Sequence, residues 1–349
     1  MKKVGIITIT GLGNYGNRLQ NYALQKTIEK LFSCHCETFL NKSCRIKGYI
    51  KKIIMPKRER LSKRELAFQR FNEEFVHFSN IKINNIFKNR RLLEYDCLIC
   101  GSDQIWNSDY PENDRANFGY FFSSVKAISY AASFGTSTIA MNKKKRYAKY
   151  LKQLKAISVR EDKGKELVEQ LTGREDVYVH VDPTFLLTAE EWLPVEKKPE
   201  LYKDKKYILK YFLGGKNHEL DKQLEEYAKV HDLEVIDIIS KDSPYYNIGP
   251  SEFLFLERNA ELIITDSFHS CAFAIIYERP FIVAERRETN LQSMGSRIDT
   301  LLNKFHLEDR RYIDGSLDGI AKNSINYSDI NKILEFERNA SVQYLEKYL

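Results

Sequence analysis

The sequence has no run of apolar residues near the roughly 18 that a membrane-spanning helix requires, and its mean hydropathy is −0.47. Its first residues, MKKVGIITIT, combine two lysines with an apolar run, as a signal peptide does. That run is short and β-branched, however, and no small-residue cleavage site follows it. We therefore expect a buried first strand here and a cytoplasmic protein.

Signatures of metal and hydrolase sites are also missing. No H-x-x-x-H spacing and no G-x-S-x-G nucleophile elbow occurs. Among six cysteines only Cys97 and Cys100 form a C-x-x-C motif, and no second pair completes a zinc site. These two lie in an apolar run typical of a strand, whose alternation places them on opposite faces of a sheet. We expect buried structural thiols, no disulfide framework and no metal.

Positive charge is abundant, and one segment holds most of it. The segment 42–64 contains ten Lys or Arg and one acid, Glu59, so its net charge is +9. Because the whole chain has a net charge of +7, the remaining residues together carry −2. A solvated insertion explains this most simply. The alternatives are a surface that approaches anionic lipid, with peripheral contact with the inner membrane surface, or a phosphate-bearing substrate. Nucleic acid is disfavoured because few aromatic residues accompany the charge.

Short apolar runs alternate with longer amphipathic stretches along the 349 residues. This pattern is typical of parallel strands joined by crossover helices, and the length suits two domains. We predict an α/β fold with two Rossmann-like doubly wound domains facing across a cleft, at 1–187 and 206–325. A linker at 188–205 joins them, because the strand–helix alternation stops there and then restarts. We expect a C-terminal helix at 326–349, which either stays with the second domain or packs back against the first.

Each expected element is one of these runs or stretches. In the first domain we expect strands at 4–10, 95–101, 126–134, 156–160 and 177–187, and helices at 17–32, 65–78, 144–155 and 162–173. In the second we expect strands at 206–214, 233–239, 262–267 and 280–285, and helices at 219–232, 251–260, 270–279, 296–305 and 330–348. Gly173 is the expected C-terminal end of the helix that precedes it.

A glycine-rich segment, GLGNYGNR at 11–18, follows the first strand and opens a helix. Its backbone N–H groups can approach an anion there, with Asn14, Asn17 and Arg18 beside them. The G-x-G-x-x-G spacing also suggests a dinucleotide, but the acidic ribose partner expected about 20 residues on is unconvincing, since Glu37 is the only candidate. We therefore predict no nucleotide cofactor.

A second polar cluster, GSDQIWNS at 101–108, follows the strand that contains the C-x-x-C motif. It presents hydrogen-bonding groups at a strand end, where ligands collect in doubly wound sheets. The candidate binding residues are Ser102, Asp103, Gln104 and Asn107. These side chains either cap the following helix or bind a ligand, and the two roles are compatible.

Two further clusters contain a cation or a histidine. Arg160 ends a buried run and is either paired with a carboxylate such as Glu161 or held for an anionic ligand. TDSFHS at 265–270 places Asp266, Ser267 and His269 after a strand of the second domain. A single histidine is more often structural, but an aspartate three residues earlier is placed to orient its ring.

Taken in order, GNYGNRLQNYALQ, GSDQIWN, YAASFG, SVREDKG, VDPTFLL and TDSFHS resemble the motifs of the polysaccharide pyruvyl transferase family, from about Val4 to about Leu302. The resemblance implies an architecture like the two-domain glycosyltransferases of type B. It also implies transfer of pyruvate from phosphoenolpyruvate to a sugar of a bacterial surface polysaccharide or its lipid-linked precursor, as a cyclic ketal. Phosphoenolpyruvate is then the donor substrate, no separate cofactor is needed, and nucleic acid is not a partner.

The same resemblance implies residue roles. The family places a donor-binding arginine at the position of Arg160 and a functional histidine at that of His269. An acidic residue of the first domain also takes part, and Asp103 is our candidate. We assign His269 to proton transfer and to support of the leaving phosphate, and Asp103 to the acceptor hydroxyl, and the two roles are exchangeable.

The chain departs from the family at one position. Better-studied members read Arg-Leu-His where this chain reads Ser267, Phe268 and His269. An arginine that those members use on the donor is therefore missing. We expect Arg297, or the pair Arg286 and Arg287, to replace it.

Two other functions remain open. A nucleotide-sugar-dependent glycosyltransferase would have the same architecture, because fold does not determine function. A non-catalytic glycan-binding protein is the other alternative. It is disfavoured because a binding protein does not need Asp103, Arg160 and His269 together. Stabilisation by phosphoenolpyruvate rather than by nucleotide sugars would favour pyruvyl transfer.

Overall fold

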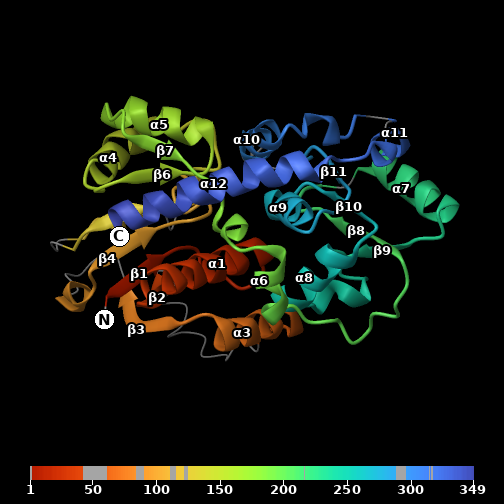
Figure 1. Cartoon of the computed structure of the whole chain (residues 1–349), viewed down its shortest axis with the longest axis horizontal. Coiled ribbons are helices and arrows are strands. Elements are labelled where there is room, and N and C mark those ends of the chain that lie inside the picture. The colour runs from red at the N-terminus through yellow and green to blue at the C-terminus, as the bar shows by residue number, and fades with distance from the viewer. Residues whose placement is uncertain are drawn as a thin grey trace, which may run out of the picture. The chain divides into compact units, whose positions relative to one another are not determined.

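A computed structural model describes residues 2–41, 61–83, 90–110, 115–121, 125–215, 217–287, 296–313, 315 and 317–349 (Figure 1). Its contacts divide the chain into two compact units, Met1–Leu186 with Ala340–Leu349, and Leu187–Asn339. The expected linker at 188–205 belongs to the second unit, where it forms α6 (Ala189–Trp192) and η4 (Leu193–Val195). Most of the basic segment 42–64 lies outside the described residues, and so does Cys44.

The first unit is built on a parallel sheet with the strand order β3-β2-β1-β4-β5. The strands are β1 (Lys3–Ile7), β2 (His35–Asn41), β3 (Phe78–Ile83), β4 (Cys97–Cys100) and β5 (Ala127–Ser129). Beyond β5, a bridge between Ala132 and Val159 joins the parallel pair β6 (Ile157–Val159) and β7 (Val177–Val179). The resulting order, with connections running in both directions from β1, is that of a doubly wound Rossmann sheet.

Capping residues mark the ends of several helices of the first unit. They are α1 (Tyr15–Phe32), α3 (Lys63–Phe75), α4 (Met141–Leu151), α5 (Asp162–Thr172), and the short η1 (Arg90–Glu94), η2 (Arg115–Phe118) and η3 (Pro183–Leu186). Asn14 caps α1 by accepting a hydrogen bond from the backbone N–H of Asn17. Ser62 and Glu65 form a capping box at the start of α3. Gly173 ends α5 with a φ of 71°, as predicted.

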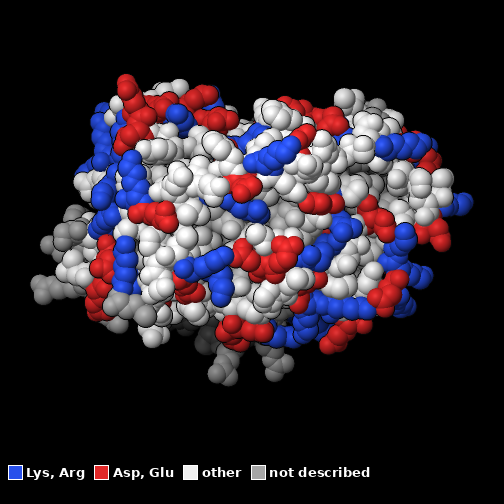
Figure 2. Space-filling model, viewed as in Figure 1, with Lys and Arg blue, Asp and Glu red and all other residues white. Residues whose placement is uncertain are grey.

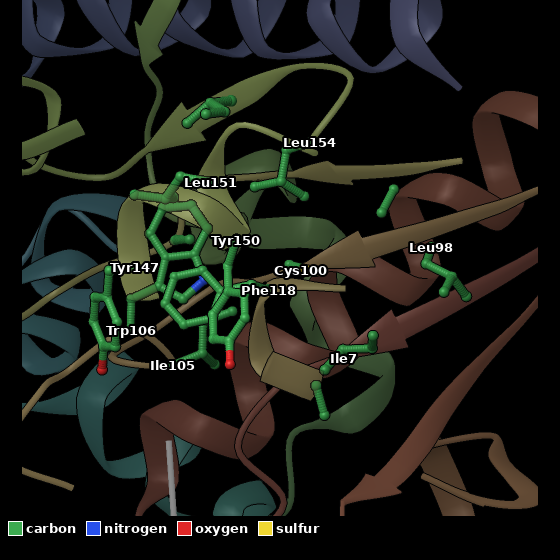
Figure 3. Close-up of a cluster of buried hydrophobic side chains, with 14 of the residues drawn as sticks. Ile7, Leu98, Cys100, Ile105, Trp106, Phe118, Tyr147, Tyr150, Leu151 and Leu154 are labelled. Carbon is green, nitrogen blue, oxygen red and sulfur yellow. The ribbon is translucent and has the colours of Figure 1, made fainter. Parts of the chain in front are cut away.

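The core of the first unit covers both faces of its sheet. One cluster packs Trp106, Phe118 and Tyr147 against β4 and α4 (Figure 3). Cys100 lies in this cluster and Cys97 in the cluster on the other face, which confirms the predicted alternation. The five described cysteines are all buried and free. Burial raises the pKa of the Cys97 thiol to about 11, so this thiol stays protonated and unreactive near neutral pH.

The second unit repeats the layout on a smaller scale. Its four parallel strands, in the order β11-β10-β8-β9, are β8 (Tyr207–Tyr211), β9 (Glu234–Asp237), β10 (Leu262–Thr265) and β11 (Phe281–Val283). Its helices are α7 (His218–Val230), α8 (Pro250–Asn259), α9 (Phe268–Ile276), α10 (Ser296–Phe305) and α11 (Leu317–Lys322), with η5 (Pro244–Asn247) and η6 (Glu308–Arg310). All nine residues of α9 are buried. The last helix, α12 (Tyr327–Tyr348), ends in residues that belong to the first unit.

Several sequence expectations are wrong at the level of elements, among them the strand expected at 126–134, which ends at Ser129. Strands β2 and β3 were not expected, and the helix expected at 65–78 ends at Phe75. β2 holds polar residues such as Glu37, which accepts a hydrogen bond from the Tyr95 hydroxyl and interacts with His35 at 2.7 Å. These partners offset the cost of burying it and lower its pKa to about 2, despite the opposing effect of burial. The strand expected at 177–187 ends at Val179, because Pro183 starts a short helix there.

Candidate functional site

The strand order places a switch point in each sheet, where neighbouring strands send their connections in opposite directions. In the first unit this point lies between β1 and β4, and in the second between β8 and β10. Ligands of open α/β sheets bind beyond the carboxyl ends of such strands. The predicted segments 11–18 and 101–108 follow β1 and β4, and 265–270 includes the end of β10.

The turn after β4 is shaped by backbone packing. Gly101 has a φ of 136°, and a Cβ there would stand 2.1 Å from the carbonyl oxygen of Tyr130. Only glycine fits this position. Asp103 follows with a φ of 68°, and its carbonyl oxygen accepts a hydrogen bond from Ser133 N–H at 2.9 Å. The predicted segment 101–108 and the motif YAASFG, at 130–135, are thus held together at the strand ends.

A chain of hydrogen bonds ties this turn to the segment after β1. Gln20 of α1 accepts from Ser102 N–H at 3.1 Å and donates to the Thr8 hydroxyl at 2.9 Å. Thr8 in turn donates to the Ser102 carbonyl oxygen at 3.1 Å. All three residues are buried, so water does not compete for these hydrogen bonds. The network therefore fixes the position of the turn.

Arg160 lies between two carboxylates just after β6. Its Nη1 donates to Oδ2 of Asp182 at 2.5 Å, and its Nη2 to Oδ1 of Asp103 at 3.3 Å. The side chains are 1%, 0% and 6% exposed, in the order Arg160, Asp182, Asp103. Burial alone lowers the pKa of the guanidinium, but the two carboxylates and Glu161 outweigh it and raise the pKa above its ordinary value. Arg160 is therefore a fixed, permanently charged group.

Asp182 is a residue of this site that the sequence analysis missed. Its Oδ1 accepts from the backbone N–H and the hydroxyl of Thr184, both at 3.0 Å, and the Ser102 hydroxyl lies 3.1 Å from its Oδ2. The sequence feature that could have identified Asp182 is its position in the motif VDPTFLL, three residues after the end of β7. An aspartate just beyond a strand end was already the criterion for Asp103.

Glu161, the expected carboxylate partner of Arg160, has a different main role. Its Oε1 accepts hydrogen bonds from the Ser133 hydroxyl at 2.8 Å and from Phe134 N–H at 3.1 Å. It thereby holds the loop after β5, while Asp182 and Asp103 make the ion pairs. Pairing of Arg160 with a carboxylate is confirmed, but Asp182 and Asp103 supply the ion pairs, because Glu161 stands at the N-cap of α5 and its Oε1 is engaged by Ser133 and Phe134.

Other predicted binding residues of the first unit are placed as follows. Arg18 is fully buried and donates to the Ile9 carbonyl oxygen; burial lowers its pKa to about 10, although Asp103 opposes this. Gln104 accepts from the Tyr110 hydroxyl at 2.6 Å, and Asn107 accepts from Asp109 N–H at 2.8 Å. Asn14 and Asn17 stand at the start of α1.

In the second unit, Asp266 organises the strand ends. Its two carboxylate oxygens accept from the backbone N–H groups of Leu213 and Gly214, each at 2.7 Å. The Nε of Arg286 lies 3.4 Å from Oδ2, and its Nη2 donates to the Asp266 carbonyl oxygen at 3.1 Å. Asp266 is therefore engaged by its own unit, and it places the guanidinium of Arg286 at the end of β10.

His269 stands in the first turn of α9, three residues after Asp266 and two after Ser267. His269 is 6% exposed, and its ring lies edge-on to the ring of Phe268, with 5.3 Å between the ring centroids. Ser267 is the N-cap residue, but its side chain makes no capping hydrogen bond. The next residue, Ser270, donates to the buried Glu257 of α8 at 2.6 Å, which anchors this turn of α9.

The candidates for the missing arginine are thus separated by the structure. Arg286 is the one paired with Asp266, while Arg287 is exposed and its carbonyl oxygen accepts from Gly215 N–H at 2.7 Å. Arg297 is buried in the first turn of α10. Among the described residues, no group of three or more His, Cys, Asp or Glu side chains has a geometry that could hold a metal ion.

These features define a protein of two Rossmann-like α/β units, each with polar side chains gathered at the carboxyl ends of its strands. The sequence profile named polysaccharide pyruvyl transferase matches residues 14–286, and the chain belongs to that family. Membership makes it a transferase that acts on polysaccharides. The match includes the predicted residues Asp103, Arg160 and His269.

Solved structures confirm the predicted fold class. A UDP-GlcNAc 2-epimerase from Methanocaldococcus jannaschii is 14% identical, with a TM-score of 0.53 over 97% of this chain and 93% of that one. A candidate UDP-N-acetylglucosamine 2-epimerase from Listeria monocytogenes is 13% identical, with a TM-score of 0.50 over 95% and 94%. At these identities the likeness concerns the fold alone. No curated protein matches the chain. No helix within the described residues is long and apolar enough to cross a membrane.

Proposed function

We propose that the protein transfers pyruvate from phosphoenolpyruvate to two hydroxyls of one sugar in a surface polysaccharide or its lipid-linked precursor. The products are a cyclic ketal and inorganic phosphate. The observation that carries the proposal is the family match over residues 14–286, which spans the strand-end clusters of both units.

The donor carries a carboxylate and a phosphate, so it requires cations and backbone N–H groups. In the second unit Arg286 supplies a guanidinium held by Asp266, and the first turn of α9 supplies N–H groups that Ser267 does not cap. In the first unit Arg160 is oriented by Asp182 and acts on the donor. These are the residues to which we assign donor binding.

The reaction begins when His269 delivers a proton to the methylene carbon of the donor. A sugar hydroxyl oxygen attacks the central carbon, and Asp103 accepts the hydroxyl proton. The bond from the central carbon to the phosphate oxygen breaks, and the second hydroxyl closes the ring. The two hydroxyl protons end on the new methyl group and on the released phosphate, so atoms and charge balance.

Incubation with phosphoenolpyruvate and a panel of glycans, with released phosphate as the readout, tests the proposal. We expect phosphate release that depends on one acceptor and a ketal detectable by mass. Thermal stabilisation by phosphoenolpyruvate, compared with UDP-GlcNAc, is the matched binding test, because a ligand at 100 times its Kd adds about 2.7 kcal/mol. Stabilisation by UDP-GlcNAc alone would favour the nucleotide-sugar-dependent alternative.

A further inference from the structure

Helix α4 of the first unit carries a dense positive surface that the proposed reaction does not use. Residues 141–155 contain seven Lys or Arg and no acid. Six of these cations are exposed: Lys144, Lys145, Arg146, Lys149, Lys152 and Lys155, which we call the basic face. Figure 2 shows Lys and Arg side chains gathered over α4, at the left of the view.

The basic face is not neutralised by the unit itself. None of its six side chains makes an ion pair with a carboxylate of the described residues, whereas Lys163 and Lys165 of the adjacent α5 pair with Glu166 and Glu169. Burial and the ammonium groups of Lys155 and Lys2 lower the pKa of Lys126. Lys126 therefore lies close enough to Lys155 for their charges to interact, and an anionic partner of the basic face would gain from both.

The composition of the basic face favours one kind of partner. Five of its six cations are lysines, which act as point charges rather than as the bidentate forks that read single phosphates. Its aromatic neighbours Tyr147 and Tyr150 are buried in the core, and the half-buried ring of Tyr120 lies under the ammonium group of Lys149 at 5.5 Å, so none of these three rings stands open for stacking on bases. Met141, at the start of α4, is 79% exposed and offers an apolar side chain beside the charges. Spread charge with an apolar anchor suits lipid headgroups.

The basic face is also connected to the candidate site. Lys143 donates to the carbonyl oxygen of Ser108, in the segment that begins with Ser102 and Asp103. The start of α4 therefore adjoins the strand-end cluster of the first unit. We propose that the basic face docks the first unit on an anionic lipid bilayer. The proposal does not require the proposed reaction.

Vesicle binding without donor or acceptor tests it. The probe is phosphatidylcholine vesicles with about one-third phosphatidylglycerol, against phosphatidylcholine alone. The variant is Lys144→Gln, Lys145→Gln and Lys149→Gln together. Its control carries the same charge loss on exposed, unpaired lysines of the second unit, Lys222→Gln, Lys229→Gln and Lys241→Gln. Each cation near an anionic surface strengthens vesicle binding by about five-fold. The α4 variant should therefore bind anionic vesicles roughly a hundred-fold more weakly than wild type, and the control variant should be affected less.

Four results would overturn the proposal. Wild-type protein could bind neutral and anionic vesicles equally, or the α4 variant could bind like its control. Binding could instead be lost only when Lys51, Lys52, Lys57 and Arg58 are changed to Glu, which would assign it to the basic segment. The protein could also fail to bind vesicles and bind an anionic polysaccharide through the same lysines. The partner of the basic face would then be a glycan rather than a lipid bilayer.

Discussion

Arg160 and Asp182 form a buried ion pair, with Nη1 and Oδ2 at 2.5 Å and both side chains almost excluded from water. Asp103 completes the cluster from the turn after β4. Three segments separated by at least 20 residues thus meet through one guanidinium. Each follows a strand of the first sheet, so the cluster depends on the order in which those strands pair.

We expect Asp182→Ala to destabilise the protein by about 3–5 kcal/mol, because it removes the shorter of the two ion pairs of Arg160 and leaves only Asp103, at 3.3 Å, beside the buried guanidinium. Urea unfolding measures this. Glu166→Ala, which removes an exposed partner of Lys163, is the control and should cost less than about 1 kcal/mol. Asp103→Asn should keep most of the stability and lose activity. Equal stability losses in the two aspartate variants would contradict this division.

His269→Ala should lower kcat by about 10² to 10⁴ with little change in the KM for phosphoenolpyruvate, because it removes proton transfer rather than binding. Steady-state phosphate release gives both constants. His231→Gln, on the exposed end of α7, is the control and should leave both unchanged. Near-normal turnover of His269→Ala would refute its role while leaving family membership intact.

Arg286→Ala should raise the KM for phosphoenolpyruvate by about ten- to a hundred-fold, the cost of one charge-assisted contact of about 1.5–3 kcal/mol. The backbone hydrogen bonds to Asp266 persist in this variant, so the fold should survive. Arg287→Ala and Arg297→Ala are the comparisons. A larger KM effect in either would transfer the donor-binding role to that residue.

Glu257 should make stability depend on pH. Burial raises the pKa of its carboxyl well above the usual value, so the folded state keeps it protonated while the unfolded state loses the proton. Stability from this group is complete below the unfolded pKa and falls as pH rises toward the folded pKa. Glu257→Gln should therefore gain stability relative to wild type from about pH 5 to about pH 8, by at most about 1.4 kcal/mol per pH unit. Urea unfolding at both pH values checks this, and a constant difference would contradict it.

Much of the candidate site could be predicted because it follows strand ends. Buried strands such as β4 and β10 are short apolar runs in the sequence. Polar residues that follow such a run, such as Asp103 and Asp266, are therefore easy to identify from the sequence. Strands β2 and β3 escaped prediction because polar residues such as Glu37 interrupt them. The hydrogen bond that Tyr95 donates to Glu37 joins positions far apart in the chain, so no local pattern reveals it.

The sequence by itself determined the α/β class, the alternation of strands and helices, and the polar segments that follow the strands. It did so because hydrophobic periodicity and turn chemistry act over a few residues. The tertiary structure decided which of those segments meet. Pairing of β4, β5, β6 and β7 brings Asp103, Arg160 and Asp182 together, and pairing of β8 with β10 lets Asp266 hold Leu213 and Gly214. It also selected Asp182 over Glu161 as the ion-pair partner of Arg160, because hydrogen bonds from Ser133 and Phe134 engage the Glu161 carboxylate.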